Sequence, residues 1–255
     1  MKKRIIISTS IILLFQNCLS ETPYKDGSIT SNHEAWTVLL QKYVDDSGNV
    51  DYTGFQKDST TLNSYLRKLT ANPPDEKTWS ESEQLAYWIN VYNAFTIKLI
   101  NQHYPLESIK DLGSIIQIPF INSPWDIKFI EINGEKLDLN NVEHSILRKK
   151  FNEPRIHFAI NCASFSCPKM RNEAYIASKL NDQLEEQAYD FINDPARNDI
   201  SLQEARLSKI FSWFKGDFTK NGSLADFINQ YSKMKIDDKM KVTFIDYDWS
   251  LNEQH

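Results

Sequence analysis

The amino-acid sequence predicts an α+β protein that is predominantly helical, with a small, mainly antiparallel sheet packed on one central buried helix. Apolar residues recur at helical spacing through most of the chain, whereas the alternation typical of strands is confined to a few short runs. Residues 80–104 are apolar around nearly the whole helical circumference, which is typical of an enclosed helix. The pair Asn133-Gly134 separates two alternating runs and predicts a hairpin. Because no repeat or linker interrupts residues 32–252, we expect a single domain there.

The N-terminal segment is typical of an export signal. Basic residues 2–4 precede an apolar stretch, residues 5–15, that is too short to span a bilayer comfortably. Cys18 stands where a lipoprotein signal places the cysteine that is acylated, although the residues before it are larger than usual. We expect residues 1–18 to be a lipoprotein export signal and residues 19–31 to be a polar tether. An ordinary signal cleaved nearby, or a simple membrane tether, is the alternative.

Two amphipathic helices are expected before the central one. In residues 33–44 and 59–71, large apolar side chains recur three and four positions apart. The loop 45–52 has some oxygen-bearing side chains of a calcium loop, but Gln56 stands where a calcium loop needs a bidentate glutamate. A turn at Gly48 is therefore expected instead of a calcium site.

The central helix is bounded by sequence signals at both ends. Ser80 and Glu83 are spaced as a capping box, and Pro105 follows the other end. Asn90 and Asn93 are three positions apart and share one face of this otherwise apolar helix. Buried amides need hydrogen-bond partners, so this face is expected to contact other polar groups.

After the hairpin, five further elements are expected. Asn140 and Glu143 are predicted to cap a helix over residues 141–151. Residues 156–162 are predicted to form a buried strand because they are a short apolar run. The remaining elements are a long amphipathic helix that ends before Pro195, helices over residues 207–215 and 223–233 with Gly216 ending the first, and a strand over residues 241–252.

Charge and composition exclude one class of partner. The chain has a formal net charge of -5, and removing residues 1–17 would take away three positive charges and no negative ones, giving -8. Proteins that bind nucleic acid usually carry a basic patch, and no dense basic run occurs here. We therefore expect no nucleic-acid partner.

The candidate site lies around the segment "HFAINCASFSCPKM", residues 157–170. If residues 156–162 are extended, His157 and Asn161 face one side and Cys162 faces the other. His157 and Cys162 would then be roughly 16 Å apart and could not form a catalytic dyad without a bulge. We expect His157 and Asn161 to join the two asparagines of the central helix in one polar cluster, which is either the floor of a pocket or a structural network.

Four states are open for Cys162 and Cys167. In an oxidising compartment the pair can form a disulfide if the loop between them folds back. A zinc site with His144 or His157 is less expected, because the spacing is looser than that of usual ligand pairs. A catalytic thiolate fits Cys167 better than Cys162, because Cys167 precedes the helix expected after Arg171. Cys162 can also be a small core residue.

Other polar and aromatic residues have structural and functional alternatives. His144 is expected to have a structural role beside the helix cap, and Arg148 can bind a carboxylate or phosphate or form a surface ion pair. The tryptophans at positions 125, 213 and 249 can line a groove, but a place in the core is the stronger expectation.

Five segments resemble the DUF547 family in one consistent order. They are "AYWINVYNAFTIKLI", "PWDIKFIEI", "VEHSILRKKF", "RIHFAINCASFSCPKM" and "YDWSLN", which together span most of residues 34–252. The resemblance implies a domain found as single exported bacterial proteins, and it implies no established activity. The order of a buried helix followed by a strand with histidine is also similar to papain-like and transglutaminase-like enzymes, where a cysteine opens the helix. Here that helix opens without a cysteine, so the nucleophile is either missing or replaced by Ser82.

A ligand- or protein-binding module of the cell envelope is the function we expect, because no complete catalytic set can be assembled from the sequence. The expected binding residues are Asn90, Asn93, Asn161, His144 and Arg148. The alternative is a thiol- or histidine-dependent enzyme acting on amide or ester bonds, with His157, Cys162 and Cys167 as catalytic residues. A structural domain stabilised by a disulfide or zinc is the second alternative. No cofactor is expected, and the expected partners are the membrane through the lipid on Cys18 and a small molecule or an envelope protein.

Overall fold

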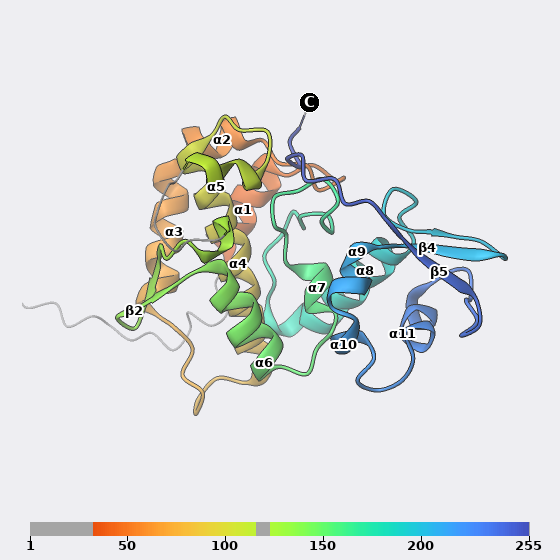
Figure 1. Ribbon diagram of the computed structural model, residues 1–255. Helices are drawn as coiled ribbons and strands as arrows, with labels where there is room; N and C mark the ends of the chain where they lie inside the picture. Colours follow the sequence, from red (N-terminus) through yellow and green to blue (C-terminus); the bar gives the residue numbers. More distant parts are fainter. Residues whose placement is uncertain (1–32, 116–122, 255) are drawn as a thin grey trace, which may run out of the picture.

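The computed structural model describes residues 33–115 and 123–254, so the expected export signal, tether and lipidated Cys18 lie outside the described residues. The fold class is confirmed: the described chain is mainly helical and contains two small sheets, one of two strands and one of three. Figure 1 shows helices α1–α6 on one side and helices α8–α11 with the three-stranded sheet on the other, with α7 between them.

The N-terminal helices surround the central one. Helices α1 (Glu34–Tyr43) and α3 (Ser59–Ala71) are confirmed, and a short helix α2 (Tyr52–Lys57) lies between them. Sequence analysis did not identify α2, which begins where Asp51 accepts a hydrogen bond from the backbone N–H of Gly54. The turn at Gly48 is confirmed. Gly48 has φ +83°, and a Cβ there would lie 2.5 Å from the Cβ of Lys169, so a side chain is excluded by both strain and space.

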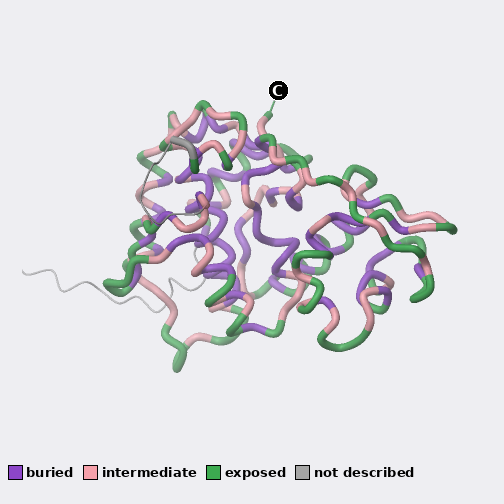
Figure 2. The backbone as a smooth tube through the Cα atoms, in the orientation of Figure 1, coloured by how far each residue is buried: buried purple, intermediate pink, exposed green. Residues whose placement is uncertain are grey.

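Helix α4 (Glu81–His103) forms the centre of this half, and its capping box between Ser80 and Glu83 is confirmed. Figure 2 shows the chain buried along most of this helix, as expected for a helix with apolar residues on all sides. Short helices follow it: the 3-10 helix η2 (Ile109–Asp111), the α-helix α5 (Leu112–Ile115) and the 3-10 helix η3 (Pro124–Asp126).

The hairpin is confirmed as strands β1 (Ile130–Ile132) and β2 (Glu135–Leu137). Its two turn residues, Asn133 and Gly134, have φ of 55° and 77°. Two positive φ values are required by the type I′ turn, whose twist matches that of the flanking strands.

The next helix differs from the prediction in form and in its cap. It is a π-helix, η4 (Asn141–Leu147), continued by α6 (Arg148–Lys150). Asn140 does not cap it but donates a hydrogen bond to Asp126, 2.7 Å away. Asp138 accepts from the N–H of Asn141 at 2.6 Å instead. Glu143, the other predicted cap, is buried.

The predicted strand over residues 156–162 is wrong, because residues Ile156–Ala159 form a single helical turn, α7. Glu153 starts the turn by accepting the N–H groups of Arg155 and Ile156 through its side chain and its carbonyl. All four residues of α7 are buried, so no polar face marks the helical period. A short, fully apolar run does not distinguish a buried helix from a buried strand.

The C-terminal half contains four helices and the three-stranded sheet. The elements are 3-10 η5 (Ala177–Lys179), α8 (Leu180–Ile192), β3 (Asp199–Ile200), β4 (Glu204–Ser208), α9 (Lys209–Trp213), α10 (Lys215–Phe218), α11 (Leu224–Tyr231) and β5 (Lys241–Ile245). Strand β3 pairs antiparallel with β4, and β5 pairs parallel with β4 across the three intervening helices. The long helix ending before Pro195 is confirmed.

Three boundaries in this half were predicted wrongly. The helix expected over 207–215 begins at Lys209, because the residues before it form β4. Gly216 does not end a helix but lies inside α10. The last strand ends at Ile245, and the segment after it runs along the loop that contains the two cysteines, with its bridge between Ser164 and Leu251.

The buried side chains form two hydrophobic clusters. The first gathers around α4 and includes α1–α3 and the hairpin, and the second contains Phe158 with side chains from α8, β4 and α9–α11. Helix α7 contributes Ile156 to the first cluster and Phe158 to the second. The segment that sequence analysis selected as the candidate site therefore lies at the junction of the two clusters.

Candidate functional site

A cavity of about 210 Å³ opens at this junction. We call it the aromatic cavity, because its wall contains Tyr92, Trp125, Trp213, Phe214, Tyr247 and Trp249. The polar residues of the wall are Asn140, Glu143, His144 and His157, and the two cysteines Cys162 and Cys167 complete it together with Ile160, Pro168 and Ile210. An apolar cavity with a few converging polar groups is the usual form of a small-molecule site.

The three tryptophans are in the wall of the cavity and not in the core, so the stronger sequence expectation for them was wrong. None of them is buried, and Trp213 is 47 % exposed. Trp249 lies between the other two, with its ring centroid 5.6 Å from that of Trp125 and 5.8 Å from that of Trp213. The ring centroid of Tyr247 lies 4.5 Å from that of Trp249. The ammonium group of Lys110 lies 3.9 Å from the centre of a Trp249 ring, which places a cation beside this aromatic group.

His157 is deeply buried in the wall, with 2 % exposure. Its ring stacks on Phe214 at 3.9 Å, and Nε2 lies 2.9 Å from Oδ2 of Asp217. Burial lowers the pKa of His157, and the bond to Asp217 only partly opposes this. A neutral ring bonded to a carboxylate carries its proton on Nε2, since a carboxylate only accepts. Nδ1 is then an acceptor, and among the described residues it has no hydrogen-bond partner.

Asp217 links His157 to Arg148 and, through Arg148, to His144. Its pKa is held far below the usual range, first by the hydrogen bond from His157 and then by Arg148, whose Nε lies 2.6 Å from Oδ2. Arg148 also donates from Nη1 to Nδ1 of His144 at 2.9 Å. Since arginine cannot accept, Nδ1 of His144 is the acceptor, and a neutral His144 carries its proton on Nε2. The pKa of His144 is lowered by burial and by Arg148.

Glu143 adds a buried carboxyl group to the same wall. Burial raises the pKa of Glu143 to about 7, against the opposing effects of Arg148 and of a hydrogen bond with Tyr92. It projects from the π-helix η4, and π-helical turns are rare and frequent at functional sites. We define the histidine cluster as Glu143, His144, Arg148, His157 and Asp217.

The asparagines form a separate cluster, which we call the asparagine cluster: Asn90, Asn93, Asn161 and Asn252. The predicted single cluster with His157 is therefore wrong. Asn90 bonds the backbone of Tyr175 through both side-chain atoms, at 2.7 and 3.1 Å. Asn93 donates to the carbonyl of Ala159 and accepts from the N–H of Asn161, both at 2.9 Å. The physical reason is the helical turn α7, which directs His157 to Asp217 and leaves only Asn161 beside α4.

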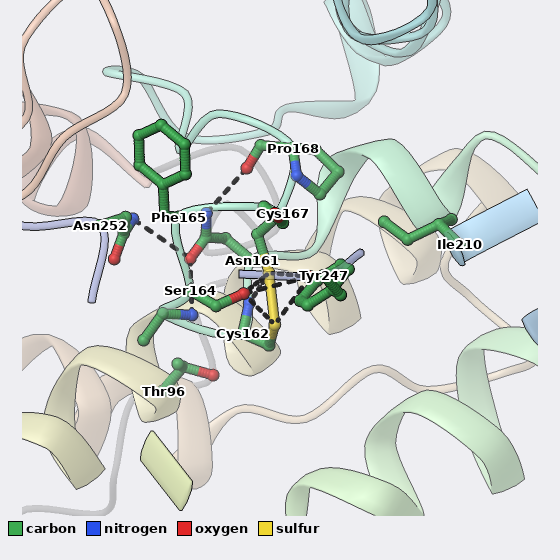
Figure 3. The surroundings of a disulfide bond; sticks show 12 residues. Thr96, Asn161, Cys162, Ser164, Phe165, Cys167, Pro168, Ile210, Tyr247 and Asn252 are labelled. Atoms are coloured by element: carbon green, nitrogen blue, oxygen red, sulfur yellow. Dashed lines mark hydrogen bonds between the residues drawn. A yellow bond between two sulfur atoms is a disulfide. The ribbon is translucent and has the colours of Figure 1, made fainter. Parts of the chain in front are cut away.

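Asn161 organises the loop that contains the cysteines. Its amide donates to the carbonyl of Pro168 at 2.7 Å, and its Oδ1 accepts from the N–H of Ala163 at 2.8 Å and from Asn252 at 3.4 Å (Figure 3). Ala163 has φ 62°, a left-handed conformation that this side-chain bond supports. The loop is thus shaped by amide hydrogen bonds at both of its ends.

Cys162 and Cys167 are joined by a disulfide, with their Cα atoms 6.4 Å apart (Figure 3). In this state neither sulfur is a nucleophile, so a catalytic thiol requires prior reduction. Cys162 is partly exposed, whereas Cys167 is 3 % exposed. The hydroxyl groups of Ser164 and Tyr247 lie against both sulfurs.

Among residues 33–115 and 123–254, no group of three or more histidine, cysteine, aspartate or glutamate side chains is placed to hold a metal ion.

In the same two ranges, no helix is long and apolar enough to cross a membrane.

Three residues of the site were not identified from sequence as functional: Glu143, Asp217 and Tyr247. Glu143 stands beside His144, but its spacing is also that of a helix cap, and the cap was preferred. Asp217 bonds a histidine 60 positions away, and no local pattern records such a contact. Tyr247 lies in a segment predicted to be a strand.

Part of the sequence matches the model of a known protein family. Residues 76–192 match the family described as "Protein of unknown function, DUF547". The resemblance is therefore confirmed over these residues, which carry α4, the hairpin, the π-helix, α7, the cysteine loop and α8. The flanking parts of the expected match, including "YDWSLN", lie outside the matched range. No curated protein and no solved structure matches the sequence.

Proposed function

Because residues 76–192 match DUF547, a family whose description assigns no activity, we propose from the geometry that the protein is a ligand-binding module and that the aromatic cavity is its binding site. The observation that carries the proposal is the unpartnered Nδ1 of His157. A buried acceptor without a partner costs free energy, and a ligand with a hydrogen-bond donor would remove that cost.

The size and wall of the cavity restrict the ligand. A cavity of roughly 150 Å³ binds benzene, so about 210 Å³ accommodates one ring and a polar substituent. The aromatic wall favours a flat or apolar ring by offset stacking and edge contacts. At the mouth, His144 supplies a donor through Nε2. The ligand class is therefore a ring-sized group with one hydrogen-bond donor and one acceptor, either free or at the end of a larger molecule.

Phenol and toluene are suitable probes, because both have one ring and only phenol carries a donor. We expect phenol to bind about tenfold more tightly than toluene, as one hydrogen bond in a sheltered site is worth roughly 1.4 kcal/mol. Isothermal titration calorimetry on the full chain measures both affinities, and saturation-transfer NMR confirms contact with the protein.

The matched variants are His157→Phe and His103→Phe. His157→Phe keeps the stack on Phe214 and removes the acceptor, so the preference for phenol should disappear. His103 is at the end of α4 and outside the cavity wall, so its replacement should leave both affinities unchanged. If neither probe binds, or if His157→Phe retains the preference, the cavity is not a binding site of this kind.

The cellular place of the module is a further part of the proposal. The basic and apolar segment before Cys18 supports export, lipid attachment to Cys18, and a position at the periplasmic or outer surface of the membrane. Intact mass of the protein isolated from membranes should show the mass of an acylated cysteine at a new N-terminus. A Cys18→Ala chain should lack this mass and leave the membrane fraction. An unmodified N-terminus in the first case contradicts lipid anchoring.

One observation favours a second candidate, a histidine-dependent hydrolase of amide or ester bonds. The carboxylate of Asp217 orients His157 and leaves its other nitrogen free, as in catalytic carboxylate–histidine pairs. In such an enzyme, Nδ1 of His157 would take a proton from an attacking water, and Glu143, with its pKa near 7, would supply a proton to the leaving group. The test is hydrolysis of p-nitrophenyl acetate from pH 5 to 9. His157→Gln and Glu143→Gln should each lower the rate, unlike His103→Gln, and equal rates for all chains would exclude this candidate.

A further inference from the structure

The disulfide between Cys162 and Cys167 has two sulfurs in unequal surroundings. Cys162 is partly exposed, while Cys167 is buried. Both contribute to the wall of the aromatic cavity, so the bond faces a space that a small molecule can enter. Thiol–disulfide exchange begins with attack on the accessible sulfur, and the other sulfur leaves as a thiolate. The geometry therefore determines which sulfur would be attacked and which would leave.

Hydrogen-bond donors converge on the buried sulfur. The backbone N–H of Cys162 lies 3.0 Å from Sγ of Cys167, and the hydroxyl of Tyr247 lies 3.2 Å from it. Ser164 lies 3.3 Å from each of the two sulfurs and 3.1 Å from the oxygen of Tyr247, whose distance to Sγ of Cys162 is longer, at 3.5 Å. Each hydroxyl has one proton, so Ser164 can donate to Tyr247 while Tyr247 donates to the sulfur (Figure 3). Such donors stabilise a thiolate more than a neutral sulfur.

A positive charge lies at the same end of the loop. Arg197 donates to the carbonyl oxygen of Cys167 at 3.3 Å and to that of Phe165 at 2.7 Å. The same guanidinium group is paired with Asp194 at 2.7 Å, so its main effect is to hold the backbone of Cys167 and Phe165 in place. The backbone N–H of Cys162 and the Tyr247 hydroxyl are therefore the donors that favour Cys167 as the leaving thiolate.

Hydrogen bonds that involve neither sulfur also hold the loop. Asn161 holds its two ends through Ala163 and Pro168. The outer part is held by the C-terminal segment. The backbone N–H groups of Phe165 and Ser166 donate to the carbonyls of Ser250 and Asp248, at 2.7 and 3.2 Å. These bonds remain after reduction, so the two thiols would stay adjacent and could be oxidised again.

We propose that Cys162–Cys167 is a redox-active pair that exchanges electrons with a low-molecular-weight thiol entering the aromatic cavity. A thiolate of that compound attacks Sγ of Cys162, the bond to Cys167 breaks, and Cys167 leaves as a thiolate. A second thiolate then attacks the sulfur of the thiol compound in the mixed disulfide and releases Cys162. The protein gains two electrons, and two thiols become one disulfide. This inference is independent of the ligand proposed above.

Glutathione is the probe for the test. The oxidised full chain is equilibrated in buffers of glutathione and glutathione disulfide, quenched with acid and alkylated. Trypsin cleaves after Arg155 and Lys169, so one peptide carries both cysteines and Cys18 lies in another. We expect the alkylated fraction of this peptide to change over the accessible buffer range. A peptide that stays oxidised in every native buffer, and is reduced only in denaturant, would overturn the proposal.

Variants test the donors and the direction of attack. Tyr247→Phe should shift the equilibrium toward the disulfide about tenfold, or about 30 mV for a two-electron couple. Tyr87→Phe is the control, because it removes a buried hydroxyl bonded to Leu69 and should change the constant less than twofold. A Cys167→Ser chain should form a mixed disulfide with glutathione disulfide at least tenfold faster than Cys162→Ser. An equilibrium unchanged by Tyr247→Phe, or equal rates for the two serine variants, would contradict the assigned roles.

Discussion

Two polar clusters lie on either side of residues 156–168 and differ in how completely their groups are paired. The asparagine cluster bonds backbone groups of the loop and of Tyr175 through both atoms of its buried amides. The histidine cluster contains a buried acceptor, Nδ1 of His157, that has no partner among the described residues. It also contains a buried carboxyl group whose pKa is raised to about 7.

The difference supports the proposal that the asparagine cluster has a structural role and that the histidine cluster faces a ligand. An amide has both a donor and an acceptor and no charge, so it can be buried at low cost once backbone groups complete it. A carboxyl or imidazole group loses hydration when buried, and its pKa shifts as a result. Perturbed pKa values in a concave, partly open wall mark functional sites more often than closed networks do. The predictions below test this division.

The largest expected effect is on stability, from Asn93→Ala. The substitution removes two hydrogen bonds of 2.9 Å and leaves the carbonyl of Ala159 and the N–H of Asn161 buried without partners. We expect the free energy of unfolding to fall by about 4 kcal/mol, measured by urea denaturation. Asn63→Ala is the control: its side chain accepts from Lys98 in a partly exposed position and should cost under about 1 kcal/mol. Equal losses would remove the special role of the asparagine cluster.

The second prediction concerns pH and Glu143. Its pKa is raised from 4.5 to about 7 in the folded state. The unfolded chain therefore releases this proton first as pH rises, and stability that is full below pH 4.5 is lost progressively up to pH 7. Glu143→Gln removes this loss. The variant's advantage over wild type in the free energy of unfolding should therefore be larger at pH 8 than at pH 4.5 by about 3 kcal/mol.

The measurement is urea denaturation of wild type and variant at pH 4.5 and pH 8. Glu135→Gln, on the exposed side of the hairpin, should leave the pH dependence unchanged. If Glu143→Gln has the same pH dependence as wild type, the carboxyl group is not buried in the uncharged form and the histidine cluster resembles a surface network.

A smaller effect is expected from His157→Phe on stability. The phenyl ring keeps the stack on Phe214 and removes the unpartnered acceptor, while one bond to Asp217 is lost. Asp217 keeps its partner Arg148. We expect the free energy of unfolding at pH 7 to change by about 1 kcal/mol or less, far below the cost of Asn93→Ala. A loss as large as that of Asn93→Ala would show that His157 is structural.

The smallest effect on stability is expected from Trp213→Leu in the cavity wall. Trp213 is 47 % exposed and stacks on Trp249, so its loss should cost roughly 0.5 kcal/mol in unfolding. Phenol affinity should fall several-fold, because the ring lines the cavity. Thermal unfolding and calorimetry on the same sample separate the two effects. A variant that unfolds much more easily while binding phenol normally would reverse the assignment.

Most of the helical fold could be predicted because its elements carry periodic or local signals. The capping box of Ser80 and Glu83 and the two positive-φ residues of the hairpin turn are each decided by neighbouring residues. Helix α7 could not be predicted, since four consecutive buried residues have no polar face. Strand β4 was missed because its partner β5 is more than thirty residues further along the chain, and β3, which pairs with β4, is only two residues long.

The segment chosen from the sequence as the candidate site lines the aromatic cavity, but the neighbours expected for His157 were wrong. His157, Cys162 and Cys167 do face one cavity, and Asn93 and Asn161 do meet. A strand period placed His157 beside Asn161, whereas the helical turn places it beside Asp217. Side-chain direction depends on the backbone conformation, so one wrong element changed the expected neighbours of every residue in it.

The sequence alone is enough to predict the helix-rich class, the central buried helix, the hairpin, the resemblance to DUF547 and the segment that lines the aromatic cavity. These follow from spacing, capping and turn chemistry, which act over a few residues. Other features depend on the tertiary structure. The asparagines hydrogen-bond backbone groups, His157 bonds Asp217 across 60 positions, and the three tryptophans line one cavity. Burial and pairing depend on segments distant in the chain, and burial is what shifts the pKa of Glu143 and leaves Nδ1 of His157 without a partner.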